Sequence, residues 1–320
     1  MKKFKKVLLL TDTKKSSINQ VNATKQYLSS YMNSQVKFQE FVVKNFNIPN
    51  ILILFLIRIN LIRLKKSLFT FRPELIISCG RVTAPFSVSI KKEVKCKNIH
   101  ILNPYISHDY FDLILVPKHD DFPNGKHIIK FNGALVNRDN FEIKNPDKKI
   151  IVENLKIPLQ KQIVTILVGG DYKGQSYKLY EINKFISYVE KLLENKNYFL
   201  CFLFSRRTPR KFQYLIKKNF SKSSYIWDGI SNNPFWYLLS NSNYIVVTGD
   251  SISMTSEAIE SGKPVFVYMP RKIKTKFQKF HNYNFTNGFA FIFEGQLRDV
   301  KINTNKFQSC FIKQISKYKI

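Results

Sequence analysis

The segment Tyr244–Tyr268, which reads YIVVTGDSISMTSEAIESGKPVFVY, most constrains how this chain can fold. An apolar run rich in β-branched residues meets a turn, and a helical pattern follows through Met254, Ala258 and Ile259. Gly262 stands where a glycine that ends a helix belongs, and a second apolar run, VFVY, comes next. This order of strand, loop, helix and strand predicts a βαβ unit of a parallel sheet.

The loop before this helix is the first candidate site. It contains Thr248, Asp250, Ser251 and Ser253, and a helix N-terminus with free N–H groups binds anions. Glu257 is one residue too far from Ser253 for a capping box, so capping does not account for it. Two interpretations stay open, an ordinary capped helix and a pocket for a phosphate-bearing ligand. Asp250 suits a sugar hydroxyl, a metal-bound water or the turn alone.

The same alternation of strand and helix runs through the chain twice. The predicted strands of the first half are Lys6–Leu10, Val36–Val43, Glu74–Ser78, Asn98–Leu102 and Leu113–Val116. Those of the second half are Ile163–Val168, Tyr198–Phe204, Tyr225–Trp227 and the two runs of Tyr244–Tyr268. Such alternation predicts an α/β fold of two Rossmann-like domains with parallel sheets.

The domain boundaries follow from a polar segment. Phe141–Gln162 is interrupted by two prolines and has one short apolar stretch, which indicates the crossing between domains. We therefore expect an N-terminal domain over 1–146 and a C-terminal domain over 160–300. Residues 301–320 form a tail, for which we expect a helix packing back on the first domain.

Ligands of open parallel sheets bind outside the carboxyl ends of the strands. The loops at these ends are Thr11–Lys14, Cys79–Pro85, Lys118–Asn124, Val168–Lys173, Ser205–Arg210 and Thr248–Ser253. The candidate phosphate-binding residues are Gly169, Gly170, Ser205, Arg206, Arg207 and Thr208, together with Thr248, Asp250, Ser251, Ser253 and Glu257. In the first half, the candidates for a ligand-facing loop are Cys79, Gly80, Arg81 and Thr83. The guanidinium groups suit a phosphate or a carboxylate, while a tight turn and solvated charge are the structural alternatives.

His119 and Asp120 are the candidate acid–base pair. Histidine titrates near neutrality, and a neighbouring carboxylate can orient it. A polar turn after a strand is the alternative. The sequence has neither a D-x-D pair nor an H-E-x-x-H motif, so we expect no metal ion and no cofactor.

The charge balance bears on partners. The 52 Lys and Arg against 22 Asp and Glu give a net charge of +30, which both codon bias and an anionic partner explain. No RRM, KH or helix-turn-helix signature accompanies it, which disfavours nucleic acid. The apolar run Ile51–Leu64 is shorter than the ~20 residues a membrane span needs. With Lys65 and Lys66 beside it, it suits a helix at an anionic membrane surface.

Localisation follows from the cysteines and the N-terminus. The four cysteines are widely spaced, as in a reducing cytoplasm. The apolar run that begins at Val7 is too short for a signal peptide. We expect a cytoplasmic protein, peripheral on the inner membrane if Ile51–Leu64 is an interfacial helix.

Several segments resemble the "elongated mitochondria" (ELM) mitochondrial fission family, found in plants and in a bacterial branch. They are ISCGRVTAP (Ile77–Pro85), the NP…FDLILVPKHD run (Asn103–Asp120), NGAL (Asn132–Leu135), SRRTP (Ser205–Pro209), NPFWYLL (Asn233–Leu239) and TGDSISMTSEAIESGKPV (Thr248–Val265). At Val82 the family more often has a second arginine, which argues against a basic pair in that loop.

The family in turn is similar to the GT-B glycosyltransferases, whose two Rossmann-like domains face each other across a cleft. The resemblance implies that Gly169 and Gly170 approach a diphosphate, that Ser251 and Ser253 hold phosphate, and that Glu257 accepts from ribose hydroxyls. It implies a glycosyltransferase that uses a nucleotide-sugar donor at the cytoplasmic membrane face. The alternative is a non-catalytic membrane adaptor that recruits a partner protein, as plant relatives do.

Overall fold

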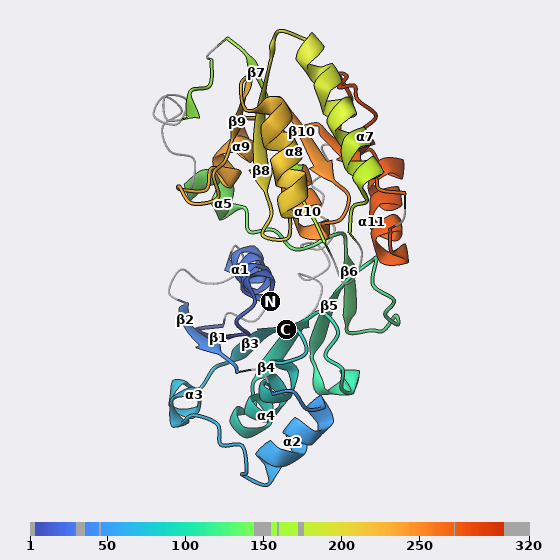
Figure 1. Ribbon diagram of the computed structural model, residues 1–320. Coiled ribbons are helices and arrows are strands. Elements are labelled where there is room, and N and C mark those ends of the chain that lie inside the picture. Colours follow the sequence, from blue (N-terminus) through green and yellow to red (C-terminus); the bar gives the residue numbers. More distant parts are fainter. Residues whose placement is uncertain are drawn as a thin grey trace. The chain divides into compact units, whose positions relative to one another are not determined.

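The computed structural model describes residues 4–29, 36–44, 46–143, 155–158, 160–171, 176–271 and 273–303 (Figure 1). The chain divides into two compact units. Unit 1 contains Met1–Asn137, and unit 2 is Arg138–Phe307. The helix expected in the C-terminal tail lies outside the described residues, which end at Asn303.

Unit 1 is a six-stranded sheet with helices on both faces. Its elements are β1 (Lys6–Thr11), α1 (Lys15–Ser29), β2 (Lys37–Val42), α2 (Asn50–Arg58), α3 (Lys66–Phe71), β3 (Leu75–Cys79), α4 (Ala84–Val94), β4 (Lys97–Ile101), the 3-10 turn η1 (His108–Tyr110), β5 (Leu113–Pro117) and β6 (Ile128–Phe131). The strand order is β2-β1-β3-β4-β5-β6, and every pairing is parallel. The alternation in the sequence therefore predicted the sheet type correctly.

The central strands β1, β3 and β5 of unit 1 are mostly apolar because both faces of the sheet are covered. Leu9 packs with Tyr27 and Leu28 of α1, whereas Leu8 packs on the opposite face with Ile53 of α2 and Ile90 of α4. Successive side chains of a strand point to opposite faces, so a run with no polar member requires a layer of helices on each side (Figure 1).

Unit 2 contains a second sheet of six strands. Its elements are α5 (Asp139–Ile143), β7 (Gln162–Val168), α7 (Leu179–Glu190), the 3-10 turn η2 (Lys191–Glu194), β8 (Tyr198–Phe204), α8 (Arg210–Phe220), β9 (Ser224–Ile226), α9 (Phe235–Asn241), β10 (Tyr244–Thr248), α10 (Ile252–Glu260), β11 (Val265–Tyr268), α11 (Thr275–Thr286) and β12 (Phe291–Ile292). The order β12-β11-β10-β7-β8-β9 is parallel throughout. Renumbered from β7, this is the Rossmann order, in which the chain reverses direction between β7 and β10.

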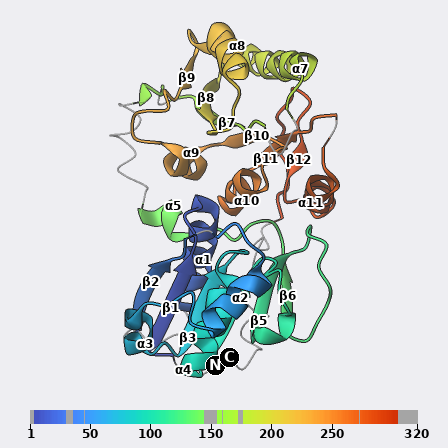
Figure 2. The ribbon, with the colours of Figure 1, turned by 60° about the horizontal axis from the view of Figure 1, so that its bottom comes forward.

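The helices of unit 2 also form two layers. Phe185 of α7 and Phe212 of α8 pack on one face of the sheet, and α9, α10 and α11 pack on the other through residues such as Leu238 and Phe280. Figure 2 shows α7 and α8 on one side of the strands and α9, α10 and α11 on the other. Both faces of the sheet are therefore covered by helices.

Several local predictions were wrong. The helix expected over Ile51–Leu64 ends at Arg58, because Asn60 adopts a left-handed conformation with φ 59°. The helices α3, α5 and α11 and the strands β6 and β12 were not predicted. The expected linker begins inside α5 rather than after it. No helix in the described part of the chain is both long and apolar enough to cross a membrane.

Candidate functional site

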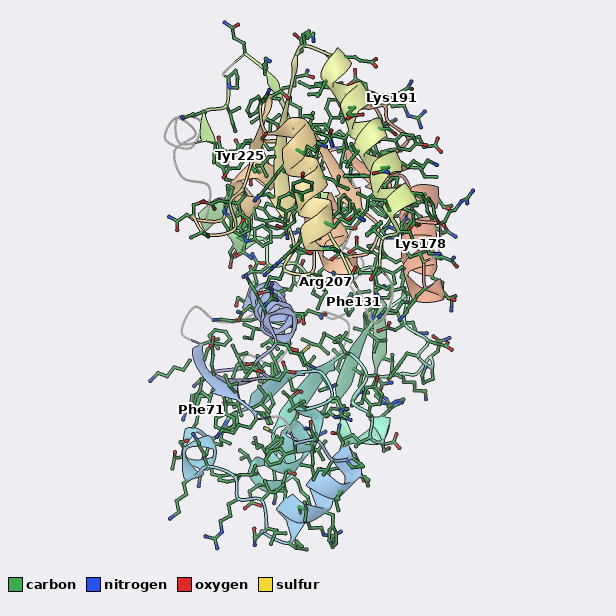
Figure 3. All side chains as sticks on the ribbon, in the orientation of Figure 1. Phe71, Phe131, Lys178, Lys191, Arg207 and Tyr225 are labelled. Atoms are coloured by element: carbon green, nitrogen blue, oxygen red, sulfur yellow. The ribbon has the colours of Figure 1, made fainter. Side chains whose placement is uncertain are left out.

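The loops after β7, β8 and β10 meet at one edge of the second sheet. β7 and β10 are neighbours in the sheet, but the chain leaves them toward opposite sides, to β8 and to β11. A crevice outside the carboxyl ends at such a reversal is where open α/β sheets bind ligands. Figure 3 shows Lys178 and Arg207 at this end of unit 2, with Lys191 at the far end of α7.

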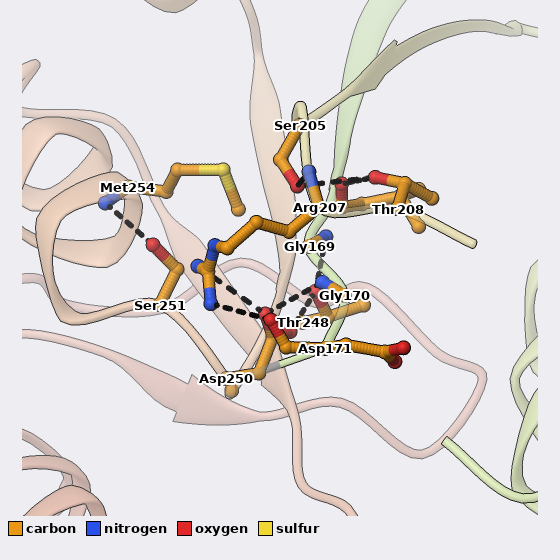
Figure 4. Close-up of polar contacts among 12 residues, drawn as sticks. Gly169, Gly170, Asp171, Ser205, Arg207, Thr208, Thr248, Asp250, Ser251 and Met254 are labelled. Atoms are coloured by element: carbon orange, nitrogen blue, oxygen red, sulfur yellow. Dashed lines mark hydrogen bonds and ion pairs between the residues drawn. The ribbon is translucent and has the colours of Figure 1, made fainter. Parts of the chain in front are cut away.

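Asp250 holds these loops together (Figure 4). Its Oδ2 accepts from the Gly170 N–H at 2.7 Å, and its Oδ1 accepts from the Thr248 hydroxyl at 2.7 Å and the Tyr177 hydroxyl at 2.9 Å. The Thr248 hydroxyl accepts in turn from the Gly169 N–H at 2.7 Å. Of the roles proposed for Asp250, this geometry favours an internal one, the cross-linking of neighbouring loops.

Gly169 and Gly170 are required by the packing of these loops against each other. A Cβ on Gly169 would lie 2.1 Å from Asp250 Oδ2, and one on Gly170 would lie 2.0 Å from the Arg207 carbonyl oxygen. Both N–H groups already donate inside the protein. The groups that approach these glycines within the protein are Asp250 and the Arg207 peptide, and their approach to a diphosphate stays a prediction.

Ser205 and Thr208 also serve the loop in which they stand. The Thr208 hydroxyl donates to the Val168 carbonyl at 2.8 Å, and Ser205 Oγ accepts from the Arg207 N–H at 3.1 Å. The two hydroxyl oxygens are 3.1 Å apart. This turn anchors the loop after β8 to the end of β7 and directs the backbone of Arg207 toward Gly170.

The charged side chains at this edge include Arg207, Asp250 and the exposed Arg206. Arg207 Nη2 lies 3.7 Å from Asp250 Oδ2, with 37% of the arginine side chain exposed and 11% of the aspartate side chain. Arg207 Nη1 also donates to the Asp171 carbonyl at 3.2 Å. Burial raises the pKa of the Asp250 carboxyl above its ordinary value, and the bonds from Thr248, Gly170 and Tyr177 oppose that rise. The Arg207 side chain thus lies at the strand ends with about a third of its surface exposed to solvent (37%).

The N-terminus of α10 supplies further donors. Ser251 is the N-cap, and its hydroxyl oxygen accepts from the Met254 N–H at 3.4 Å. Among the contacts of the described residues, none takes up the N–H of Ile252 or Ser253. Ser253 is exposed and Glu257, one turn further along α10, is half-buried. Two donors and the positive end of the helix dipole therefore remain for an anion.

The first-half candidates belong to unit 1. Gly80 has φ +80°, which favours glycine at the turn after β3. The buried Thr83 donates to the Cys79 carbonyl at 2.9 Å, and Arg81 is exposed. Burial, with a smaller effect of the Asp12 charge, raises the pKa of the Cys79 thiol to about 12. Cys79 is therefore a neutral thiol rather than a nucleophile near pH 7.

His119 and Asp120 follow β5 in the same unit. His119 is buried and Asp120 is half-buried, and His119 Nε2 lies 3.8 Å from Asp120 Oδ1. That distance allows a charge interaction but not a hydrogen bond. The two residues are thus close enough for a charge interaction, and their role as an acid–base pair stays a prediction.

Sequence reasoning missed several residues that support this edge. Tyr177 binds Asp250, and the buried His281 of α11 has Nε2 2.8 Å from the Gly249 carbonyl oxygen. Glu181 accepts from the N–H groups of Lys178 and Arg271, both at 2.9 Å. No local motif marks Tyr177 or His281, whereas Glu181 stands three residues after the N-cap of α7. Among the described residues, no group of three or more His, Cys, Asp or Glu side chains is placed to hold a metal ion.

Comparisons with known proteins agree on family and fold. The family model described as "Mitochondrial fission ELM1" matches residues 19–309. The Rickettsia prowazekii (strain Madrid E) protein RP120 is 30% identical over 238 residues, 62% of this chain and 65% of that protein. The Arabidopsis thaliana "Mitochondrial fission protein ELM1" is 25% identical over 235 residues, 65% of this chain and 54% of that protein. The matched region spans less than two thirds of each of these relatives.

Solved structures show the fold. UDP-GlcNAc 2-epimerase from Methanocaldococcus jannaschii has a TM-score of 0.57 at 11% identity, covering 97% of this chain and 99% of that one. The Neisseria meningitidis UDP-GlcNAc 2-epimerase, solved bound to UDP-GlcNAc, also has a TM-score of 0.57, at 15% identity, covering 98% and 92%. The two parallel sheets therefore form a fold like GT-B, as the sequence predicted.

Proposed function

The chain belongs to the mitochondrial fission ELM1 family, and on that premise we propose that it is a GT-B-like glycosyltransferase that uses a nucleotide-sugar donor at a membrane face. The observation that carries this proposal is the open N-terminus of α10 beside Arg207, at the reversal point of a Rossmann-order sheet. The similar epimerase from Neisseria meningitidis was solved with UDP-GlcNAc, which makes UDP-sugars the first donors to test.

In the proposed reaction, the bond between the anomeric carbon and the diphosphate oxygen breaks and a bond to an acceptor hydroxyl oxygen forms. The nucleoside diphosphate leaves with the electron pair of the broken bond. Arg206, Arg207 and the Ile252 and Ser253 N–H groups stabilise its phosphates. Glu257 accepts from ribose hydroxyls, and a general base takes the proton of the acceptor hydroxyl.

Binding of a nucleotide-sugar tests this proposal directly. UDP-GlcNAc, other nucleotide-sugars and UDP are titrated calorimetrically against wild-type protein, Arg207→Ala and Glu257→Gln. We expect wild-type binding, with a loss of about tenfold or more in Arg207→Ala because charge-assisted bonds to phosphate contribute more than about 1.5 kcal/mol. Arg298→Ala, at an exposed arginine of the same unit, is the control and should bind normally. No binding by wild-type protein would refute the donor site.

A second candidate is the non-catalytic adaptor. The name of the Arabidopsis relative ties that protein to mitochondrial fission. The site geometry adds a physical reason, because the Gly169 and Gly170 N–H groups are occupied within the protein. A protein that binds nucleotide but turns over no donor with any acceptor fraction, while retaining a specific protein partner in pull-down, would support the adaptor.

A further inference from the structure

Helix α2 presents an apolar face outward. Its buried residues Ile53 and Ile57 pack into the core beside α4, on the face of the first sheet opposite α1 (Figure 1). Five large apolar side chains nearby lie outside, and we name them the α2 patch: Ile51 (64% exposed), Leu52 (41%), Phe55 (55%), Ile59 (50%) and Leu61 (71%). Contiguous exposed apolar residues of this size mark an interaction surface.

The rotation of α2 is fixed by its first residue. Asn50 is buried, and its Nδ2 donates to the Arg81 carbonyl at 2.7 Å and to the Pro104 carbonyl at 2.8 Å. At the other end, the N–H groups of Leu61 and Ile62 donate to the Leu56 carbonyl at 2.9 and 3.1 Å. The α2 patch therefore cannot turn into the core without breaking these bonds.

The segment that carries the α2 patch has charges of one sign. Between Glu40 and Glu74 the sequence holds no acidic residue, and its basic residues are Lys44, Arg58, Arg63, Lys65, Lys66 and Arg72. Arg58, Arg63, Lys65 and Lys66 are exposed. Within the described ranges, no ion pair joins any of these four to a carboxylate. This surface combines apolar side chains with cations that no carboxylate of the described residues pairs with. It therefore complements a partner surface that is apolar and negatively charged.

We propose that α2 and the turn after it dock this protein on an anionic lipid bilayer. The short helix lies in the plane of the interface, with Ile51, Phe55 and Leu61 among the acyl chains and the basic side chains at the phosphate groups. A bilayer satisfies both halves of this surface at once, because acyl chains cover the apolar row and anionic headgroups meet the cations. The inference is independent of the donor site, since lipid binding needs no nucleotide.

Co-sedimentation with vesicles tests the proposal in the absence of nucleotide. Wild-type protein should sediment with phosphatidylcholine vesicles that contain phosphatidylglycerol, and far less with phosphatidylcholine alone. Raising the salt from about 0.05 to about 0.5 M should weaken the binding, because screening shortens the reach of the charges. Failure of wild-type protein to bind the anionic vesicles at low salt would overturn the proposal.

Two variants separate the parts of the surface. Ile51→Gln/Phe55→Gln removes apolar contact, and Arg58→Glu/Arg63→Glu reverses charge; each should weaken vesicle binding about tenfold or more. Lys217→Glu/Lys218→Glu, at exposed positions of α8 in unit 2, makes the same change in net charge and should bind as wild type. Equal losses in both charge variants would show attraction by bulk charge alone and overturn the proposal.

A fluorescent probe checks the depth of insertion. Phe55→Trp should shift its emission to the blue on anionic vesicles and be quenched by brominated phosphatidylcholine. Tyr214→Trp, at an exposed residue of α8 (63%), should do neither. If Ile51→Gln/Phe55→Gln binds vesicles normally but changes the mass measured by light scattering, the surface is a contact between copies and the lipid proposal falls.

Discussion

Asp250 Oδ2 occupies the space in which Gly169 would carry a Cβ, at 2.1 Å from that position. The same oxygen accepts from the Gly170 N–H at 2.7 Å. One carboxylate therefore excludes a side chain from the first glycine and binds the backbone of the second. The loops after β7 and β10 can meet only because both constraints are satisfied together.

Gly169→Ala should destabilise unit 2 by about 1–3 kcal/mol, the usual range for overpacking a buried site. Because the clash is with Asp250, Asp250→Ala should relieve part of it. Urea denaturation of both single variants and the double variant measures the coupling. We expect the double variant to lose less stability than the sum of the single losses, and strict additivity would contradict the clash.

Tyr177→Phe should lower the free energy of unfolding by about 1–3 kcal/mol, because it removes a hydrogen bond to the buried Asp250 carboxylate. The measurement is the urea midpoint and slope. Tyr214→Phe removes the hydroxyl of an exposed tyrosine and is the matched control, with an expected change within about 0.5 kcal/mol. If the two variants were equally stable, the Tyr177 bond would contribute nothing.

The buried histidines should make stability depend on pH. Burial lowers the pKa of His100 to about 3 and that of His281 to about 4. Unfolded histidine titrates near pH 6.5, so in this range the unfolded chain binds more protons than the folded one. Stability should therefore fall as pH drops from about 6.5 toward 4, by about 1.4 kcal/mol per pH unit for each histidine.

Denaturation at a series of pH values measures this effect. His281→Gln retains a donor for the Gly249 carbonyl and removes the titration, so its profile should be flatter than that of wild type. His108→Gln, at a histidine that is not buried, should leave the slope unchanged. A wild-type profile that is flat between pH 6.5 and 4 would be incompatible with two neutral buried histidines.

Arg138→Met should destabilise unit 2 strongly. Arg138 Nε and Nη2 donate to Glu260 Oε2 at 2.9 and 2.7 Å, and only 2% of the Glu260 side chain is exposed. Removing one member of a buried ion pair costs about 3–5 kcal/mol, because the other charge stays buried. The comparison is Lys97→Met, which removes the lysine of a more exposed ion pair with Asp112; 51% of the lysine side chain and 17% of the aspartate side chain are exposed. This variant should lower the free energy of unfolding, measured by urea denaturation, by less than about 1 kcal/mol.

The sequence by itself determined the fold class and the position of most strands. The strands Tyr198–Phe204 and Val265–Tyr268 have the bounds that their apolar runs predicted. Gly262 ends α10 with φ +72°, as a glycine after a helix should. These features are local, because periodicity and turn chemistry depend on residues close together in the chain. The end of α2 was missed since the conformation of Asn60 has no strong local signal.

Only the tertiary structure decided what the candidate residues contact. Tyr177 and Gly170 reach Asp250 across 73 and 80 positions of sequence, and strand order, rather than any motif, brings them together. The same order determined that the Gly169 and Gly170 N–H groups are used inside the protein. The sequence pattern thus located the loops. The pairing of strands far apart in the sequence decided which hydrogen-bond donors and acceptors of these loops meet.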